Sequence, residues 1–322
     1  MTHTVVALLC HGDTTPIRWH IPFCRPVNDP NIDRGMIMKH IDNTAFGGER
    51  ACFAAHDTRF EGVTFHPGES AIKHTHHVEA HHCRFTGKYP FWHNNDVLIE
   101  NSLFTVDARA AIWYSSNVRM RDTRVEAPKM FRSLEGLTLE RVTLSNAAEC
   151  GWNCRNIDFR DVEIANGDYL LMNSQHIHID GFRLQGNYSF QDARDVVIRN
   201  AHLDSRDALW NTRDVTVYDS VLEGEFLGWH SRNLRLVNCT IRGTQPLCYV
   251  TNLMMKNCVM EHTDLCFEYS TIDVDIVGSI DSIRNPAGGR IRADHIDEVF
   301  LDEHCLNPGA CRIETRETEV PA

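Results

Sequence analysis

The chain has 322 residues, of which 42% are hydrophobic and 24% charged, a composition typical of a globular protein rather than a disordered one. Its formal net charge is −12, which argues against a nucleic-acid backbone or an anionic membrane surface as partner. No apolar stretch approaches the length of a membrane span, so we expect neither nucleic acid nor membrane among its partners.

Residues 1–37 match no unit of the repeat that follows them. They contain Pro16, Pro22, Pro26 and Pro30 and lack the layout of a signal peptide, because the apolar run from Val5 to Cys10 is short and has no basic residue before it. We expect an N-terminal extension or cap, or an over-extended translation start. The twelve cysteines are then interpreted as reduced thiols of a cytoplasmic protein.

A repeat of 19 to 21 residues begins after this segment. Its anchor position holds an aliphatic residue or Thr, at Thr58, Val78, Val97, Val118, Leu137, Ile157, Ile177, Val196, Val215, Leu234 and Leu253. The second and seventh residues after each anchor are apolar, and the fourth is usually Asn, Asp or Gly. This pattern predicts a strand with one face inward, a bend at the fourth residue, and a second short strand.

A third short strand is predicted to close each coil. Five of the six tryptophans take one position in it, namely Trp92, Trp113, Trp152, Trp210 and Trp229. Stacked coils of this kind predict an all-β protein, a single-stranded right-handed parallel β-helix. We expect about 11 to 12 coils over residues 38–302, closing in a last coil and cap, with residues 303–322 as a C-terminal tail.

Several segments resemble one protein family. They are Phe46–Phe53, Gly68–Ala71, Tyr89–His93, Ala110–Ser115, Gly243–Tyr249, Asp264–Ser270 and Ile280–Pro286. They are similar to an uncharacterised bacterial family of right-handed parallel β-helix proteins that carries a domain of unknown function, roughly over residues 38 to 302. The resemblance implies the fold and no established activity, so no catalytic role is carried over from it.

Charged side chains precede the aromatic position of the third strand. Along the chain they run Lys88, Arg109, Lys129, Glu149, Asp168, Asn187, Asp207, Glu225, Gln245 and Asp264. Adjacent coils lie about 4.8 Å apart, so we expect one column of charge whose like neighbours repel unless solvent or a ligand relieves them. A solvated strand edge that discourages aggregation is the simpler interpretation.

The functional interpretation of this column assigns roles to its members. No catalytic residue is identified, but Glu149 with Asp168, and Asp207 with Glu225, are candidates for a retaining glycosidase pair or a calcium site. Calcium is the one candidate cofactor. Candidates for binding a sugar are the five tryptophans above together with Lys88, Arg109, Lys129, Arg132, Asp264 and Glu268.

The orientation of the tryptophans has two interpretations. The residue after each is usually polar, so strand alternation points the rings inward. It then leaves outward an apolar stripe suited to a protein partner, made of Phe91, Ile112, Met130, Leu171 and Leu209. The alternative is an external platform for sugar rings.

A metal site is predicted only weakly, and no signature of pectinase-type enzymes is found in the repeat. His77, Glu79 and His81 alternate onto one strand face, which is feasible for a transition metal, although a solvated surface explains them as well. Fold analogy favours a solenoid that binds a carbohydrate along the charged column and third strand. A glycoside hydrolase or polysaccharide lyase, and a non-catalytic protein-interaction scaffold, are the alternatives; whether the protein is an enzyme stays open.

Overall fold

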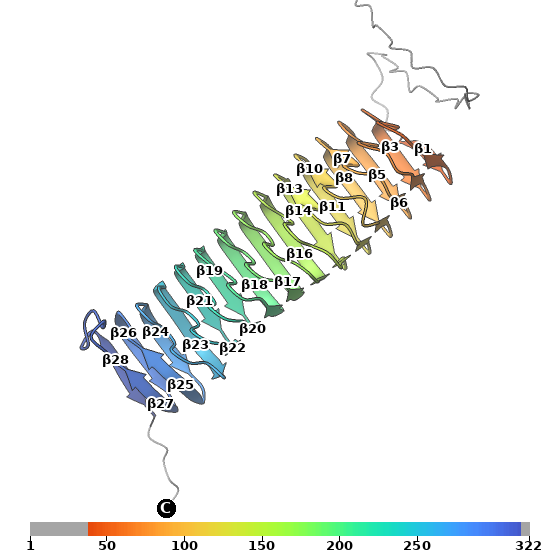
Figure 1. Cartoon of the computed structure of the whole chain (residues 1–322). Helices are drawn as coiled ribbons and strands as arrows, with labels where there is room; N and C mark the ends of the chain where they lie inside the picture. Colours follow the sequence, from red (N-terminus) through yellow and green to blue (C-terminus); the bar gives the residue numbers. More distant parts are fainter. Residues whose placement is uncertain (1–37, 317–322) are drawn as a thin grey trace, which may run out of the picture. The chain divides into compact units, whose positions relative to one another are not determined.

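The computed structural model describes residues 38–316. Every regular element in this range is a β-strand, and all strand pairs are parallel (Figure 1). Fifteen strands form the first side of the coils: β1 (Lys39–Asp42), β3 (His56–Glu61), β5 (His76–His81), β8 (Asn95–Glu100), β11 (Ser116–Arg121), β14 (Glu135–Glu140), β16 (Arg155–Ile164), β17 (Gln175–Gln185), β18 (Arg194–Asp204), β19 (Arg213–Tyr218), β21 (Arg232–Val237), β23 (Thr251–Glu261), β24 (Thr271–Ile276), β26 (Gly288–Ala293) and β28 (Cys311–Thr315).

The second side of the coil is a short strand after the bend. It is separate in β2 (Ala45–Phe46), β4 (Thr64–Phe65), β6 (Arg84–Phe85), β9 (Leu103–Phe104), β12 (Arg124–Val125), β15 (Thr143–Leu144), β20 (Val221–Glu223) and β22 (Thr240–Arg242). In β16, β17, β18 and β23 it continues directly from the first strand. The third side contains β7 (Phe91–Trp92), β10 (Ile112–Trp113) and β13 (Phe131–Arg132), and a further pair, β25 (Ser279–Arg284) and β27 (His295–Phe300), lies near the C-terminal end.

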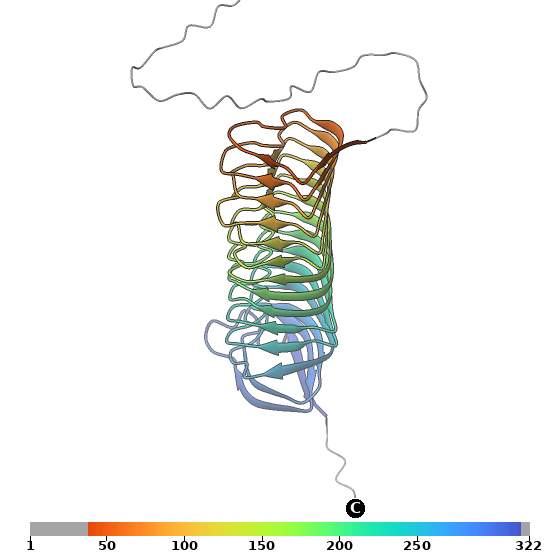
Figure 2. The ribbon, with the colours of Figure 1, turned by 90° about the vertical axis from the view of Figure 1, so that its right-hand side faces the viewer.

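The predicted parallel β-helix and its register are confirmed. Each anchor residue pairs with the anchor of the next coil, as Thr58 does with Val78 and Leu234 with Leu253. Figure 2 shows the coils lying one above another with their corners aligned. Each inward residue therefore meets its counterpart one coil away, which is why the periodicity of the sequence predicts the stacking so well.

The β-helix has more coils than the 11 to 12 that the sequence predicted. Strand β1 precedes the first anchor, and β24, β26 and β28 extend the ladder beyond the last one. Because β28 pairs with β26, the chain past residue 302 belongs to the helix at least as far as residue 315 and is not a tail there. Residues 1–37 and 317–322, with the expected cap and chain end, lie outside the described residues.

The bend between the first two strands is left-handed in successive coils. Asn101, Asp161 and Asn238 have φ of 48°, 51° and 55° at this position. Asn and Asp tolerate this conformation better than other non-glycine residues, as the sequence pattern predicted. Their side chains also bond along the stack: the Asn257 amide donates to Asn238 Oδ1 and the Asn238 amide donates to Asp219 Oδ1, both at 2.9 Å.

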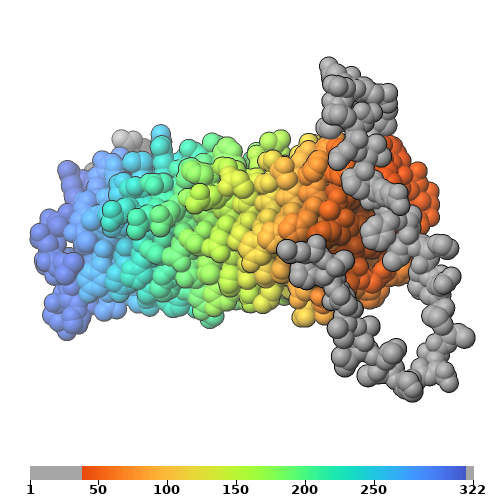
Figure 3. Space-filling view, turned by 90° about the horizontal axis from the view of Figure 1, so that it is seen from above, coloured from red at the N-terminus to blue at the C-terminus, as the bar shows by residue number. Residues whose placement is uncertain are grey.

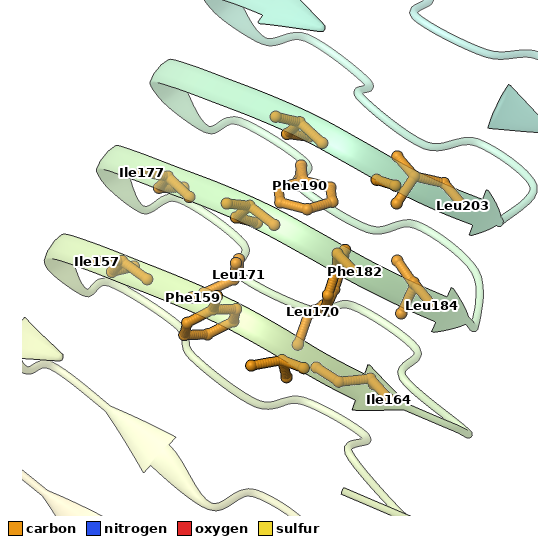
Figure 4. Packing of buried hydrophobic residues seen from close by; sticks show 14 of the residues in the cluster. Ile157, Phe159, Ile164, Leu170, Leu171, Ile177, Phe182, Leu184, Phe190 and Leu203 are labelled. Atoms are coloured by element: carbon orange, nitrogen blue, oxygen red, sulfur yellow. The ribbon is translucent and has the colours of Figure 1, made fainter. Parts of the chain in front are cut away.

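The core is one continuous cluster that fills the interior of the stack (Figure 4). At the seventh position after the anchor, Phe65 stacks on Phe85 with ring centroids 5.1 Å apart, and Phe85 on Phe104 at 4.5 Å. Farther along, Leu171 and Phe190 of the third side point inward against β16, β17 and β18. Among the described residues there is no helix that could cross a membrane.

Candidate functional site

The tryptophans of the third side lie on the outside of the coil, so the inward orientation favoured by alternation is wrong. Trp92, Trp113 and Trp152 are half-buried, and the Nε1 of each donates to a backbone carbonyl of the next coil at 2.7 to 2.8 Å. The expected outward stripe of Phe91, Ile112, Met130, Leu171 and Leu209 is fully buried instead. A protein partner therefore cannot use that stripe.

The cause is the backbone of the residue after each tryptophan. His93, Asn153 and Asn211 have φ of 58°, 56° and 53°, so the chain turns there and strand alternation starts again. The polar residue marks a corner of the coil and not the next outward strand position. The five tryptophans do share one column, which confirms that part of the prediction.

The N-terminal half of this tryptophan column is already occupied by the protein's own cations. The Lys73 ammonium lies 5.5 Å from the Trp92 ring, and Trp92 stacks on Trp113 at 5.2 Å. Arg132 takes the position in the next coil, and its guanidinium lies 4.4 Å from the rings of both Trp113 and Trp152. These cation–π contacts stabilise the surface and cover ring faces that a sugar would otherwise use.

The column is interrupted after Trp152. Met172 and Gln191 hold the position in the next two coils, as the hydrogen bonds from Asn153 N to Met172 O and from Asn173 N to Gln191 O show. The rings resume with Trp210, which lies 5.8 Å from Trp229. The two coils without a ring therefore lie between two aromatic segments.

A polar hollow of about 210 Å³ lies beside this interruption, at the beginning of β16, β17 and β18. It is lined by Asn153, Arg155, Asn173, Ser174, Gln175, Asp192 and Arg194. Amides, a hydroxyl and guanidinium groups offer donors and acceptors together, which suits a ligand rich in hydroxyl groups. We call this feature the hollow.

An arginine row runs from the hollow along the stack. Arg155, Gln175, Arg194, Arg213 and Arg232 are successive register partners at the first residues of β16, β17, β18, β19 and β21. Within residues 38–316, none of the four arginines has a carboxylate oxygen within 4.0 Å. Side chains of one column come from consecutive coils, which appear as successive bands of colour in Figure 3.

The aspartates beside the row are bound elsewhere. Asp192 accepts a hydrogen bond from the Asn211 amide at 2.5 Å, and Asp214 accepts one from the Asn233 amide at 2.7 Å. Asp195 lies 2.7 Å from the His176 ring. These bonds run along the stack, so none of the three carboxylates forms an ion pair with the arginines. Arg155 donates instead to the side-chain carbonyl oxygen of Gln175, from Nε at 2.6 Å and from Nη2 at 3.1 Å.

The predicted charged column is two columns, which corrects that expectation. Backbone hydrogen bonds place Lys88, Arg109 and Asp168 in one column and Lys129 and Glu149 in the next, where φ is positive. The sequence analysis again did not detect a corner with left-handed backbone, because the number of residues between a charged residue and the next tryptophan does not show where the chain turns.

The basic members of these columns mostly pair with acidic ones. Lys129 Nζ and Arg132 Nη2 lie 2.9 and 3.4 Å from Glu149, and Lys88 Nζ lies 3.4 Å from Glu69. Of the four cations predicted to bind a sugar, only Arg109 is exposed without an ion pair among the described residues. This surface is largely self-compensated.

The two proposed carboxylate pairs are not equivalent. Glu149 is held by two cations, and Asp168 Oδ1 accepts a hydrogen bond from Asn187 N at 2.8 Å. Asp207 is only 5% exposed, whereas Glu225 is exposed. Burial raises the pKa of the Asp207 carboxyl, Arg206 opposes this shift, and Glu225 adds to it. The surroundings of Asp207 therefore favour its protonated form more than those of a solvated carboxyl would.

The remaining candidates are placed as follows. Glu268 lies 3.1 Å from Arg284 Nε, and Asp264 is exposed. The three residues of the weak metal prediction do not converge, because His77 pairs with Asp57 at 2.8 Å. In the part of the chain that the structure describes, no three His, Cys, Asp or Glu side chains are grouped to hold a metal ion.

His81 belongs to another set of contacts. Its ring lies between Glu79, at 3.0 Å, and Glu100, at 3.2 Å, and is almost fully buried. A second hollow, of about 580 Å³, lies over β8, β11 and β14, and its two charged residues, Asp96 and Arg119, pair with each other at 3.1 Å. Neither place leaves a charge for a ligand to satisfy.

Sequence reasoning missed the arginine row, although a signal for it was present. Each of its members lies two residues before an anchor, at Arg155, Gln175, Arg194, Arg213 and Arg232. Aligning the coils on their anchors would have shown four arginines in five coils. The prediction aligned the polar residues on the tryptophans, which lie on the other side of the corner.

Among solved structures, the chain is similar to PfbA, a surface adhesin of Streptococcus pneumoniae, at 10% identity and a TM-score of 0.38, covering 80% of this chain and 81% of that one. It is similar to HetL, a pentapeptide repeat protein of the cyanobacterium Nostoc, at 12% identity, a TM-score of 0.28 and coverage of 66% and 87%. It is also similar to the A-module of the mannuronan C-5 epimerase AlgE4 of Azotobacter vinelandii, at 8% identity and a TM-score of 0.28, covering 86% of this chain and 88% of that one.

Residues 39–314 match a family described as "Protein of unknown function (DUF3737)". No curated protein matches the sequence. The match covers most of the chain and nearly all of the β-helix.

Proposed function

The chain belongs to the DUF3737 family of proteins of unknown function, and from its geometry we propose that it binds a carbohydrate in the hollow. The observation that carries the proposal is the coincidence of two features. A polar concavity whose charged residues form no ion pair among the described residues lies where the outer tryptophan column is interrupted, between Trp152 and Trp210.

The chemistry of the hollow supports this class of ligand. Asn153, Asn173 and Gln175 provide amides, and Arg155 and Arg194 provide planar guanidinium groups. Bonds from Asn173 to Asn153 Oδ1 and from Arg155 to Gln175 hold these groups in place and leave the amide nitrogens of Asn153 and Gln175 as donors for a ligand. Planar polar side chains can bond two neighbouring hydroxyls at once, which fixes a ring in one orientation. The neighbouring indole rings are apolar surfaces with a polar edge, suited to a sugar that has both kinds of face.

Binding is tested by titration calorimetry of the full chain with neutral and acidic oligosaccharides. We expect Gln175→Ala to weaken binding about tenfold, since it removes hydrogen bonds at the centre of the hollow. Gln185→Ala is the matched control, because Gln185 is exposed at the other end of the same strand. Absence of binding by every saccharide, or equal affinity of both variants, would contradict the proposal.

A carbohydrate-active enzyme is the alternative that Asp207 favours. A buried carboxyl with a raised pKa is the usual state of a general acid, and Glu225 lies on the neighbouring coil. The test is incubation of the protein with any saccharide that it binds, followed by analysis of chain length. Cleavage that is lost in Asp207→Asn supports this alternative, whereas intact ligand contradicts it.

Calcium, a cytoplasmic location and a protein partner stay predictions. A calcium requirement is checked by repeating the titration in the presence of a chelator. Apart from Cys52, the cysteines of the described residues are free thiols, which supports the location expected from the sequence. Pull-downs would identify a protein partner if no saccharide binds.

A further inference from the structure

The arginine row is a concentration of positive charge without ion pairs among the described residues, in a protein whose net charge is −12. Arg194, Arg213 and Arg232 are exposed and occupy the same position in three consecutive coils. Among the described residues none of them has a carboxylate within 4.0 Å or any other side-chain partner. Parallel strands lie about 4.8 Å apart, so these like charges repel one another.

Among the residues that the structure describes, no carboxylate of the surroundings forms an ion pair with these three arginines. Asp192, Asp195 and Asp214 flank the row, but their carboxylates are bound to amides or an imidazole of neighbouring coils. Elsewhere on the solenoid the same spacing is used for opposite charges, as between Arg121 and Glu140 at 3.2 Å. A row of like charge that the fold leaves unpaired is therefore a place for an external anion.

We propose that the ligand of the hollow is a linear acidic oligosaccharide that lies along the helix axis, with its carboxylate or sulfate groups on Arg194, Arg213 and Arg232. This inference rests on the proposed function and names its substrate class. Arg194 connects the two sites, because it lines the hollow and is followed in the row by Arg213 and Arg232. One chain can thus place its first rings in the hollow and its later acidic groups on Arg213 and Arg232.

The geometry favours an acidic sugar over a nucleic acid. The row is one side chain wide and is flanked by Asp192, Asp195 and Asp214, so it accepts single acidic groups at intervals and not a broad phosphate surface. Guanidinium groups bind carboxylate and sulfate through paired hydrogen bonds. The net charge of −12 opposes a long polyanion and tolerates a short one.

Calorimetry of the full chain with matched ligands tests the inference. The ligands are a uronate hexasaccharide, its carboxyl-reduced neutral counterpart, a sulfated hexasaccharide, and a single-stranded oligonucleotide of equal charge. We expect an acidic saccharide to bind about tenfold more tightly than the neutral one, because hydrogen bonds to charged groups are the stronger ones. The uronate and sulfated ligands distinguish which acidic group the row prefers.

The variants Arg213→Gln and Arg232→Gln each remove one arginine of the row and change no residue that lines the hollow. We expect each to weaken binding of the acidic saccharide about threefold, since it removes one of three contacts, and to leave the neutral one unchanged. The controls Arg183→Gln and Arg235→Gln remove exposed arginines that lie outside the row and make no ion pair among the described residues. A melting curve of each variant checks that it is folded.

The outcomes separate this inference from the proposed function. Equal binding of acidic and neutral ligands, or wild-type affinity of the two row variants, would overturn the inference while leaving carbohydrate binding intact. Absence of binding by all saccharides overturns both. Equal affinity for the oligonucleotide overturns the assignment to a sugar.

Discussion

Two columns of charged side chains on this solenoid have the same spacing of one residue per coil but differ in how the charges are ordered. The first is an alternating ladder on the first side of the coils, in which Glu61, His81, Glu100, Arg121, Glu140, Arg160, Asp180 and Arg199 are successive register partners. The second is the arginine row. In the ladder, acidic residues alternate with His81 or with an arginine, whereas Arg194, Arg213 and Arg232 of the row are register partners in three successive coils.

The difference lies in the order of the side chains and not in the backbone. Arg121 lies 3.4 Å from Glu100 and 3.2 Å from Glu140, so it is neutralised from both coils. Arg213 lies between Arg194 and Arg232. A parallel β-helix repeats every position once per coil, so alternation stabilises the stack and repetition of one charge destabilises it unless a ligand binds.

The largest expected effect comes from breaking the ladder. Glu100→Lys places a cation between His81 and Arg121, and we expect a loss of about 2 kcal/mol in the free energy of unfolding, since hydrogen bonds to charged groups are lost and like charges meet. Thermal and urea unfolding measure this loss. Glu298→Lys is the control, because Glu298 is exposed and makes no ion pair among the described residues. Equal stability of the two variants would contradict the role of the ladder.

The next effect concerns a cation that aromatic rings compensate. Arg132→Gln removes the guanidinium between Trp113 and Trp152, and we expect a loss of about 1 kcal/mol. Arg109→Gln, which removes an exposed arginine with no ion pair among the described residues, is expected to change little. Thermal unfolding followed by tryptophan fluorescence compares the two. A loss as large for Arg109→Gln would show that the stacking is unimportant.

A smaller effect of opposite sign is expected in the row. Arg213→Gln removes a like charge, so the ligand-free protein should gain about 0.5 kcal/mol in stability. The gain should shrink in 1 M sodium chloride, where the screening length falls to about 3 Å. Melting temperatures at low and high salt provide the measurement. A loss of stability at low salt would mean that the row is compensated after all.

The smallest effect is a pH dependence at Asp207. Its pKa in the folded state is raised, chiefly by burial, so the stability that it contributes is present below its ordinary pKa of 3.8 and is lost as pH rises through the folded value. Asp207→Asn should therefore melt higher than wild type at neutral pH. The difference should vanish below about pH 3.8. The exposed Asp264→Asn is the control, and a constant difference at all pH values would contradict the burial argument.

Much of the fold follows from the sequence because inward positions repeat at a nearly constant interval. The anchors from Thr58 to Leu253 pair in the predicted order, and the bends fall at the predicted fourth position. The ends were harder to predict. Gly289 takes the anchor position opposite Ile272, and a glycine gives no hydrophobic signal of a further coil.

The candidate site was predicted only in its general location near the third side. Trp152 and Trp210 do lie on one outer column, but their rings were expected inside. The error arises at residues such as Asn153, whose left-handed backbone ends one strand and begins another. Assigning inward and outward positions by strict alternation fails at such a corner, because the alternation starts again after it.

By itself, the sequence determined the coil and its stacking, since burial of apolar side chains at a fixed period allows one register. The tertiary structure decided which outer residues become neighbours. Arg132 falls into the tryptophan column and Arg194, Arg213 and Arg232 form a row because corners and coil lengths shift residues between columns. The physical reason is that outward side chains face solvent on either side of a corner, so their polarity does not record which column they occupy.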